Sequence, residues 1–177
     1  MAAAGHFDRL DAFLRPMYQD LDGVSRVEER ERIARIARRL YEPPAPAEAR
    51  PFELLLRFHL LGRWLEKVGN LSRTTLAVPD VTEAELRRTA ASIRRLDAPL
   101  TDGERAVAAA VLIDGAGVRG LAERFARARR EGISIIDVAR EEPPPVPEWM
   151  TGPAREWLAQ RREQRATVCR ALLEEET

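Results

Sequence analysis

The sequence predicts an all-α protein, a compact bundle of about seven or eight helices that leaves room for a C-terminal helical arm. Apolar residues recur three and four positions apart along most of the chain, which is the spacing of an amphipathic helix. Helix start signals stand between these stretches, and residues 1–100 contain no convincing strand. The 177 residues are 45% hydrophobic, which is enough to bury a core.

The first two helices are expected before a proline-rich connector. An apolar stripe begins at Phe7, and Pro16 is expected to kink this helix or divide it in two. The segment Ser25–Glu28, SRVE, has the pattern of a capping box, in which the Ser and Glu side chains bond to free backbone N–H groups. It predicts a second helix that runs to about Tyr41.

A third helix follows the stiff connector EPPAPAEARP, opens at Pro51 and ends near Gly69. Its apolar stripe is wide, which is typical of the central helix of a bundle. On a helical wheel His59 shares its sector with polar residues, namely Arg63, Glu66 and Lys67. We therefore expect His59 on a solvated face or in a local ion-pair cluster. The next stretch, NLSRTTLAVPD, is the least regular and predicts an ordered loop or a short strand.

Three further start signals place helices in the second half of the chain. Thr82–Glu85 and Thr101–Glu104 have the capping-box pattern, and Ser134 stands as an N-cap. A second stiff spacer, PPPVP, precedes a last helix that begins at Thr151 or Gly152 and runs towards Glu175. We therefore divide the chain into a helical core domain, 1–142, and a spacer with a C-terminal helix, 143–177, which packs on the core or on a partner.

The composition excludes several classes of function. The 29 Lys and Arg balance 29 Asp and Glu, which argues against a dedicated nucleic-acid binder. Cys169 is the single cysteine, so an internal disulfide and a multi-cysteine zinc site are excluded. The start, MAAAGHFDRL, shows no basic stretch followed by an apolar run, so we expect no secretory signal, and the longest apolar run, Ala106–Ile113, is too short to span a bilayer. We expect a cytoplasmic protein with neither membrane nor nucleic acid as a partner.

One glycine motif points to a nucleotide. Gly115, Gly117 and Gly120 have the spacing G-x-G-x-x-G, and Asp137 lies about 20 residues further on. Over Val111–Asp137 this spacing resembles the fingerprint of flavin- and NAD-binding Rossmann proteins. The resemblance implies a βαβ unit with a pyrophosphate at the helix N-terminus and the Asp137 carboxylate on a ribose hydroxyl.

The run before the first glycine decides how the motif is interpreted. A dinucleotide site needs a strand there, whereas Ala106–Ile113 holds four alanines and follows a capping box, so we predict a helix. The glycines then mark a turn between two helices. A weaker hypothesis remains, in which the backbone N–H groups of this turn bind an anion together with Arg119.

A second pattern points to a metal. The order of HLLGRWLEKVG, AAAVLID and a later aspartate is similar to that in HD-domain metal phosphohydrolases, helical enzymes whose ligands are a His, a His-Asp pair and a later Asp. The resemblance implies a divalent metal held by His59, Asp114 and Asp137. Ile113 stands at the position of the paired histidine, and the separation from His59 is long for that family. No cofactor is expected outside this alternative.

Arginines crowd two helices, and the last helix has an unusual pattern. The arginines are Arg119, Arg124, Arg127, Arg129 and Arg130, then Arg155, Arg161, Arg162 and Arg165. Such residues bind phosphates or acidic partners, or form a solvated face with i,i+4 ion pairs. The last helix is apolar at both ends around a polar middle, AQRREQR, and Cys169 lies on its apolar stripe like a core residue. Its candidate partner-binding residues are Trp157, Leu158, Arg161, Arg165 and Leu172.

No nucleophile–base pair, pair of acids or metal cluster stands out in the sequence. We therefore expect a non-enzymatic binding or regulatory module that acts through protein–protein contacts, with a protein partner or a homo-oligomer. The first alternative is a phosphohydrolase-like protein or a degenerate relative that binds nucleotides. The second alternative is a dinucleotide binder that uses the three glycines.

Overall fold

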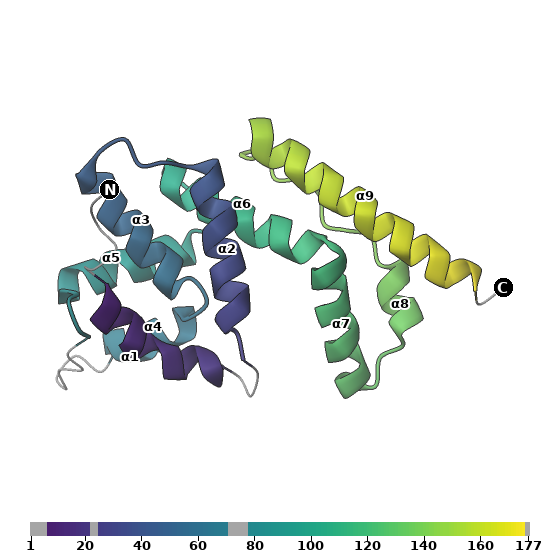
Figure 1. Ribbon diagram of the computed structural model, residues 1–177, viewed down its shortest axis with the longest axis horizontal. Helices are drawn as coiled ribbons and strands as arrows, with labels where there is room; N and C mark the ends of the chain where they lie inside the picture. The colour runs from purple at the N-terminus through teal and green to yellow at the C-terminus, as the bar shows by residue number, and fades with distance from the viewer. Residues whose placement is uncertain (1–6, 22–24, 71–77, 176–177) are drawn as a thin grey trace. The chain divides into compact units, whose positions relative to one another are not determined.

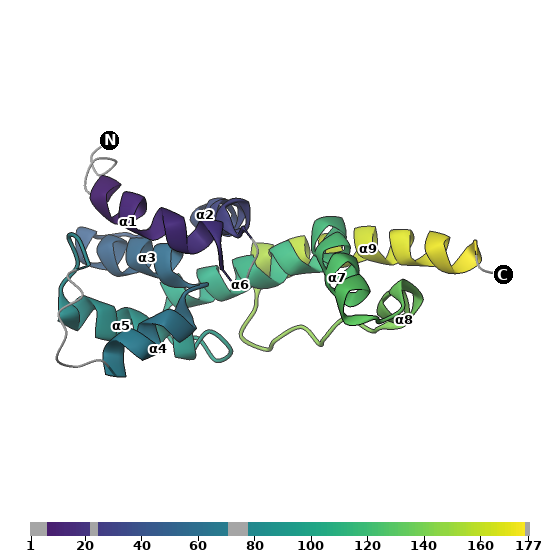
Figure 2. The same ribbon diagram turned by 90° about the horizontal axis from the view of Figure 1, so that it is seen from below.

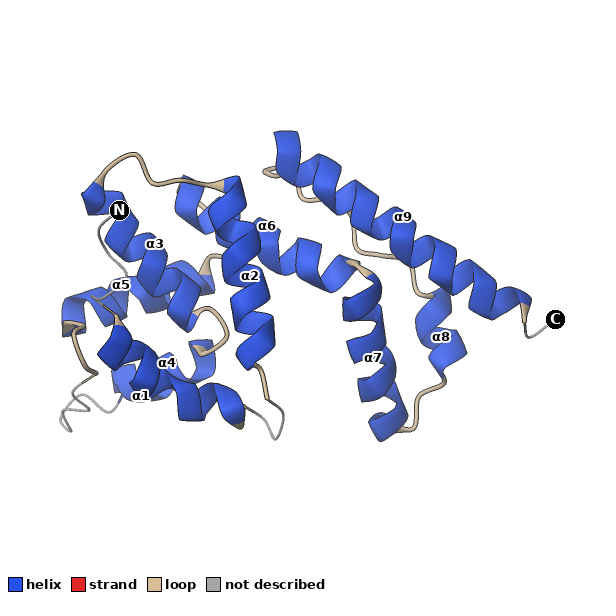
Figure 3. Cartoon of the chain, in the orientation of Figure 1, coloured by secondary structure: helices blue, strands red, loops and turns tan. Residues whose placement is uncertain are grey.

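The computed structural model describes residues 7–21, 25–70 and 78–175, and within these ranges it contains nine helices and no strand (Figures 1 and 3). The predicted all-α fold is therefore confirmed. The helices are α1 (Asp8–Gln19), α2 (Val27–Leu40), α3 (Pro46–Phe58), α4 (Gly62–Asn70), α5 (Glu83–Arg94), α6 (Asp102–Ala116), α7 (Val118–Glu131), α8 (Ile135–Arg140) and α9 (Gly152–Glu174).

The chain divides into two compact units, Met1–Ala108 and Ala109–Thr177, here called the first and the second unit. The division into 1–142 and 143–177 that the sequence suggests stays a prediction.

In the first unit, α3 lies between α1 and α2 on one side and α4 and α5 on the other (Figure 2). Phe58 of α3 is fully buried and stacks on Trp64, with ring centroids 6.2 Å apart. The core around it consists of Phe7, Leu10, Leu14, Tyr18, Leu54, Phe58, Leu61, Leu65 and Val78. α3 is thus the central helix of this unit, as its wide apolar stripe predicts.

The prediction of one third helix from Pro51 to near Gly69 is wrong in two respects: the helix starts earlier, and the stretch forms two helices. α3 begins at Pro46, because proline at the first helical position gives up no intrahelical hydrogen bond. The chain then breaks after His59, where the N–H of Leu61 donates to the carbonyl of Phe58 at 2.7 Å. α4 begins at Gly62, where an added Cβ would lie 3.1 Å from the Ile93 side chain. The break therefore brings α4 close against α5.

Two predictions before the connector have different outcomes. Pro16 does not divide the first helix, since α1 is one helix that contains it, and a kink at Pro16 stays a prediction. α2 begins at Val27 after Arg26, with no side-chain cap, so Ser25–Glu28 is not a capping box. Most of the stretch predicted as a loop or short strand, NLSRTTLAVPD, lies outside the described residues.

The capping box at the start of α5 is confirmed. The N–H of Glu85 donates to Thr82 Oγ1 at 3.2 Å, and the N–H of Thr82 donates to Glu85 Oε2 at 2.8 Å. Arg50 of α3 donates from Nε to the same carboxylate at 2.5 Å. The bond from Arg50, followed by those from Thr82, lowers the pKa of Glu85 to about 2, although burial opposes the shift.

We expect Glu85 to make the first unit sensitive to acid. A carboxylate whose pKa is lower in the folded than in the unfolded state stabilises the fold above its ordinary pKa of 4.5, and this stabilisation is lost as the pH falls towards 2. In Glu85→Gln the free energy of unfolding should therefore change with pH over this range by about 2 kcal/mol less than in the wild type. Urea denaturation at several pH values measures this difference. Glu83→Gln, an exposed neighbour, should keep the wild-type pH dependence.

In the second unit, α9 packs along α7 and α8 (Figure 1). The core residues are Leu121, Ala128, Val138, Ala139 and Cys169, so the prediction of Cys169 as a core residue is confirmed. α7 ends at Gly132, whose φ of 72° is in the left-handed region that favours glycine. Ser134 caps α8 as predicted, and its hydroxyl accepts from the N–H of Ile136 at 3.2 Å.

Candidate functional site

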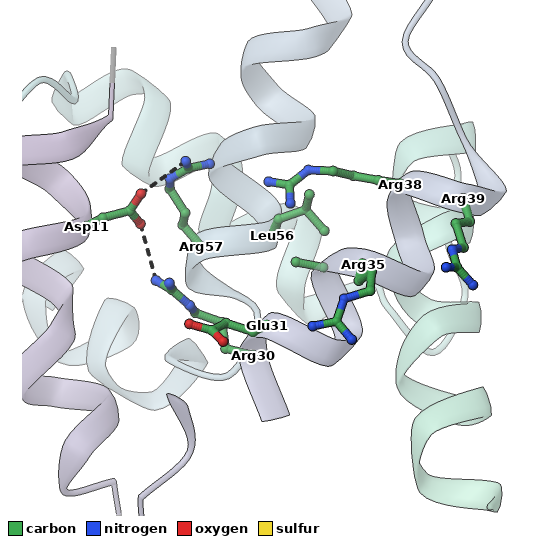
Figure 4. A pocket seen from close by; sticks show the side chains of 9 residues that line it. Asp11, Arg30, Glu31, Arg35, Arg38, Arg39, Leu56 and Arg57 are labelled. Carbon is green, nitrogen blue, oxygen red and sulfur yellow. Dashed lines mark hydrogen bonds and ion pairs between the residues drawn. The ribbon is translucent and has the colours of Figure 1, made fainter. Parts of the chain in front are cut away.

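The first unit carries a hollow of about 600 Å³ lined by residues of α1, α2 and α3 (Figure 4). This volume is in the range of pockets that bind small ligands or side chains of a partner. Most of its lining is basic. The lining residues are Asp11, Arg30, Glu31, Ala34, Arg35, Arg38, Arg39, Leu56 and Arg57, and we call this site the arginine hollow.

The amphipathic pattern of α2 places arginines at the hollow. Ile33, Ile36 and Ala37 are buried, which turns the opposite face of the helix to solvent. Arg35 and Arg39 are one helical turn apart and are exposed on that face. Packing of the apolar stripe therefore fixes the position from which these two side chains extend.

A chain of alternating charges connects the three helices. Asp11 of α1 accepts from Arg30 of α2 at 3.2 Å and from Arg57 of α3 at 3.1 Å (Figure 4). Arg57 also contacts Glu53 at 2.5 Å, and Arg38 bonds to the same carboxylate through Nε at 3.0 Å and Nη2 at 2.8 Å. Three of the five arginines therefore have carboxylate partners that hold them in place.

The network shifts the protonation of its members. Burial alone would raise the pKa of Glu53, but the hydrogen bonds from Arg38 and Arg57 outweigh it and lower that pKa below its ordinary value. Burial raises the pKa of Tyr18, whose hydroxyl donates to the backbone carbonyl of Arg57 at 2.5 Å. At neutral pH the carboxylate stays charged and the phenol stays neutral, so the alternating pattern is maintained.

The remaining two arginines differ from these three. Within the described residues, neither Arg35 nor Arg39 has a carboxylate or a hydrogen-bond partner. In Figure 4 the guanidinium groups of Arg35 and Arg38 lie on either side of the buried Leu56. A guanidinium group presents a planar fork of N–H donors that matches a carboxylate or phosphate. The hollow thus combines an apolar floor with unpaired donors.

The glycine motif lies at the junction of α6 and α7. Ala106–Ile113 is helical, as predicted, so the described residues hold no strand before Gly115. Gly117 is the N-cap of α7, and Gly120 lies in its first turn. A Cβ at Gly120 would lie 2.2 Å from the carbonyl oxygen of Gly115. The spacing therefore lets two helices meet, and nearby Arg119 contacts Glu123 at 3.6 Å.

The predicted metal ligands are spread over both units. His59 is only 7% exposed, and its Nδ1 lies 2.9 Å from the carbonyl oxygen of Leu56. The predicted solvated position of His59 is wrong because the helix breaks there, so a wheel drawn through Arg63 does not apply. Asp114 lies in α6 and Asp137 in α8. Within the described ranges, no three His, Cys, Asp or Glu side chains lie close enough to hold a metal ion.

The predicted partner-binding residues of α9 differ in exposure. Leu158 and Arg165 are buried, whereas Trp157, Arg161 and Leu172 are partly exposed. Arg161 also lies beside the start of α7, since a Cβ at Gly117 would be 3.3 Å from its Cδ. Partner binding by α9 stays a prediction. Only the partly exposed side chains, Trp157, Arg161 and Leu172, have surface that a partner could contact.

The sequence interpretation missed the arginine hollow. The signal in the sequence was ERERIARIARRL, in which apolar and arginine residues alternate at helical spacing. That pattern places arginines on one exposed face, but it does not show that Asp11 and Arg57 meet them from two other helices.

Comparisons with protein-family models, curated proteins and solved structures found no match to this chain. None of the helices in the described ranges is long and apolar enough to cross a membrane. Function is therefore inferred from the geometry and charge of the described residues.

Proposed function

We propose that this protein is a cytoplasmic, helical binding module that recognises an acidic segment of a partner protein at the arginine hollow. One observation carries the proposal. Arg35 reaches the hollow without a carboxylate partner among the described residues, while Arg30, Arg38 and Arg57 beside it are all paired. The paired arginines supply a fixed frame, and Arg35 and Arg39 supply the free donors.

The charge pattern favours a peptide over a nucleic acid. Asp11, Glu31 and Glu53 stand among the arginines and would repel a continuous phosphate backbone. A peptide can place single carboxylates at Arg35 and Arg39 and keep them away from these acids. The buried Leu56 and Ala34 offer an apolar floor to the methylene groups of glutamate. The balanced charge of the whole chain agrees with this choice.

The test uses a fluorescein-labelled hexaglutamate peptide and fluorescence anisotropy. We expect the full chain to bind this peptide and not a hexaglutamine peptide with the same label, and the affinity should fall as salt rises. Arg35→Gln and Arg39→Gln should each weaken binding roughly threefold to tenfold, because each removes a charged hydrogen bond at an exposed site. The double variant should abolish measurable binding.

The matched control is Arg88→Gln, which removes an exposed arginine on α5, away from the hollow. It should bind hexaglutamate as the wild type does. Equal weakening in Arg88→Gln and Arg35→Gln would show a general charge effect and contradict the proposal. So would equal binding of the hexaglutamate and hexaglutamine peptides.

A further inference from the structure

We propose that the second unit binds a phosphate-class oxyanion at three arginines, Arg124, Arg162 and Arg165, here called the spacer arginine cluster. This site is separate from the arginine hollow and does not depend on its function. The three side chains come from α7 and α9 and bond to the C-terminal end of α8 and the start of the proline-rich spacer.

The hydrogen bonds of the cluster define its geometry. Arg165 donates from Nη2 to the backbone carbonyl of Glu141 at 3.3 Å, and Arg162 donates from Nη2 to that of Pro144 at 2.5 Å. From the facing helix, Arg124 contacts the carboxylate of Glu141. Three cationic groups thus converge on the short segment from Glu141 to Pro144, two of them on its backbone carbonyls and Arg124 on a side chain.

The positive charge of the cluster is only partly balanced by carboxylates bonded to it. Arg165 is only 5% exposed, and within the described residues Glu141 is the one carboxylate that bonds to any of the three arginines. The Nε of Arg162 is enclosed and has no hydrogen-bond partner among these residues. Buried charges in proteins are normally paired, because an unpaired one loses its hydration without replacement. Three arginines against one carboxylate leave an excess of two positive charges.

The pKa shifts of the arginines agree with this excess of positive charge. Burial, followed by repulsion from Arg165 and Arg127, lowers the pKa of Arg124. Burial and Arg165 likewise lower the pKa of Arg162. An anion at the cluster would relieve both effects. At neutral pH a phosphate monoester or free phosphate carries a negative charge of about 1.5 to 2, and it has three or more acceptor oxygens. It therefore matches both the excess charge and the fork geometry of the arginines.

The competing account is a purely structural clamp. Backbone carbonyls at the end of α8 attract cations, and Arg162 and Arg165 hold the spacer there. A clamp predicts that removal of Arg162 destabilises the unit by the same amount in phosphate and in chloride. An anion site predicts that phosphate stabilises the wild type more than it stabilises the variant.

The test compares melting temperatures of the full chain in sodium phosphate and in sodium chloride of equal ionic strength. Phosphate at about 10 mM should raise the melting temperature of the wild type by roughly 3 °C. Arg162→Gln and Arg124→Gln should lose most of this shift. Arg155→Gln, an exposed arginine on the same helix, is the matched control and should keep it. A second arm uses O-phosphoserine in place of phosphate. A larger increase in melting temperature with O-phosphoserine would indicate a phosphate ester as the ligand, and a larger increase with phosphate would indicate free phosphate.

A second readout does not depend on stability. The ³¹P resonance of inorganic phosphate should broaden with the wild type and with Arg155→Gln, and stay sharp with Arg162→Gln. Arg35→Gln should behave as the wild type, because the hollow is a different site. Equal phosphate shifts in the wild type and Arg162→Gln, or loss of the shift in Arg35→Gln alone, would overturn the proposal.

Discussion

Replacing Gly120 with alanine is expected to lower the free energy of unfolding of the second unit by about 3 kcal/mol. The added Cβ would lie 2.2 Å from the Gly115 oxygen and 2.6 Å from its carbonyl carbon. Both are backbone atoms, so no side-chain rotation relieves the overlap, and α6 and α7 have to move apart. Urea denaturation of the full chain, followed by circular dichroism, measures the loss.

The matched control is the first glycine of the same motif. Gly115 lies in the last turn of α6, and a Cβ there would meet no atom within 4 Å. Gly115→Ala should therefore raise stability by about 0.5–1 kcal/mol, because alanine loses less backbone freedom on folding than glycine does. Equal effects of the two substitutions would show that the close contact at Gly120 does not govern the junction.

The second large effect is expected at Glu104, a carboxylate that is only 2% exposed. It accepts from the N–H of Leu100 at 2.8 Å, from the N–H of Thr101 at 3.2 Å and from Arg95 Nη2 at 2.6 Å. Glu104→Ala would remove the acceptor of both backbone N–H groups and leave Arg95 Nη2 only its longer bond to Ser92 Oγ, at 3.4 Å. We expect a loss of about 3–4 kcal/mol from the free energy of unfolding of the first unit.

Two further variants separate the causes. Glu104→Gln keeps one acceptor oxygen and should recover part of the loss, while Asp102→Ala, an exposed acid in the same first turn, should cost about 0.5 kcal/mol or less. Burial raises the pKa of Glu104, but hydrogen bonds from Ser92, Leu100, Arg95 and Thr101 outweigh it and lower that pKa. The Glu104→Ala penalty should therefore shrink as the pH falls below the ordinary value of 4.5. A penalty independent of pH would argue against the ionised carboxylate.

The sequence predicted those features that depend on neighbouring residues. The boxes at Thr82–Glu85 and Thr101–Glu104 and the cap at Ser134 involve residues two or three positions apart, and all three are present. The helical state of Ala106–Ile113 follows from its alanines in the same way. The box pattern at Ser25–Glu28 failed because α2 begins at Val27, inside the pattern, so no helix starts where the serine could cap it.

Contacts between distant segments could not be predicted in this way. The spacing around His59 predicts a solvated face only if one helix continues through this position, and the chain instead ends α3 there and begins α4 at Gly62. The hollow brings together Asp11, Arg30 and Arg57, which come from three helices and meet only once the apolar cores have packed. The burial of Glu104 likewise depends on Arg95, which reaches it from beyond the end of the preceding helix.

The contact between Gly120 and the Gly115 carbonyl also carries an evolutionary consequence. Selection should retain glycine at position 120, while position 115 is free to drift to alanine, since its Cβ has open space. Position 117 is intermediate, because the atom that a Cβ would approach belongs to the long, adjustable side chain of Arg161. Among descendants of a common ancestor the three glycines should therefore be lost at different rates. A sequence motif that requires all three glycines would therefore match nucleotide-binding proteins, and it would fail to match relatives of this chain that have lost Gly115 or Gly117.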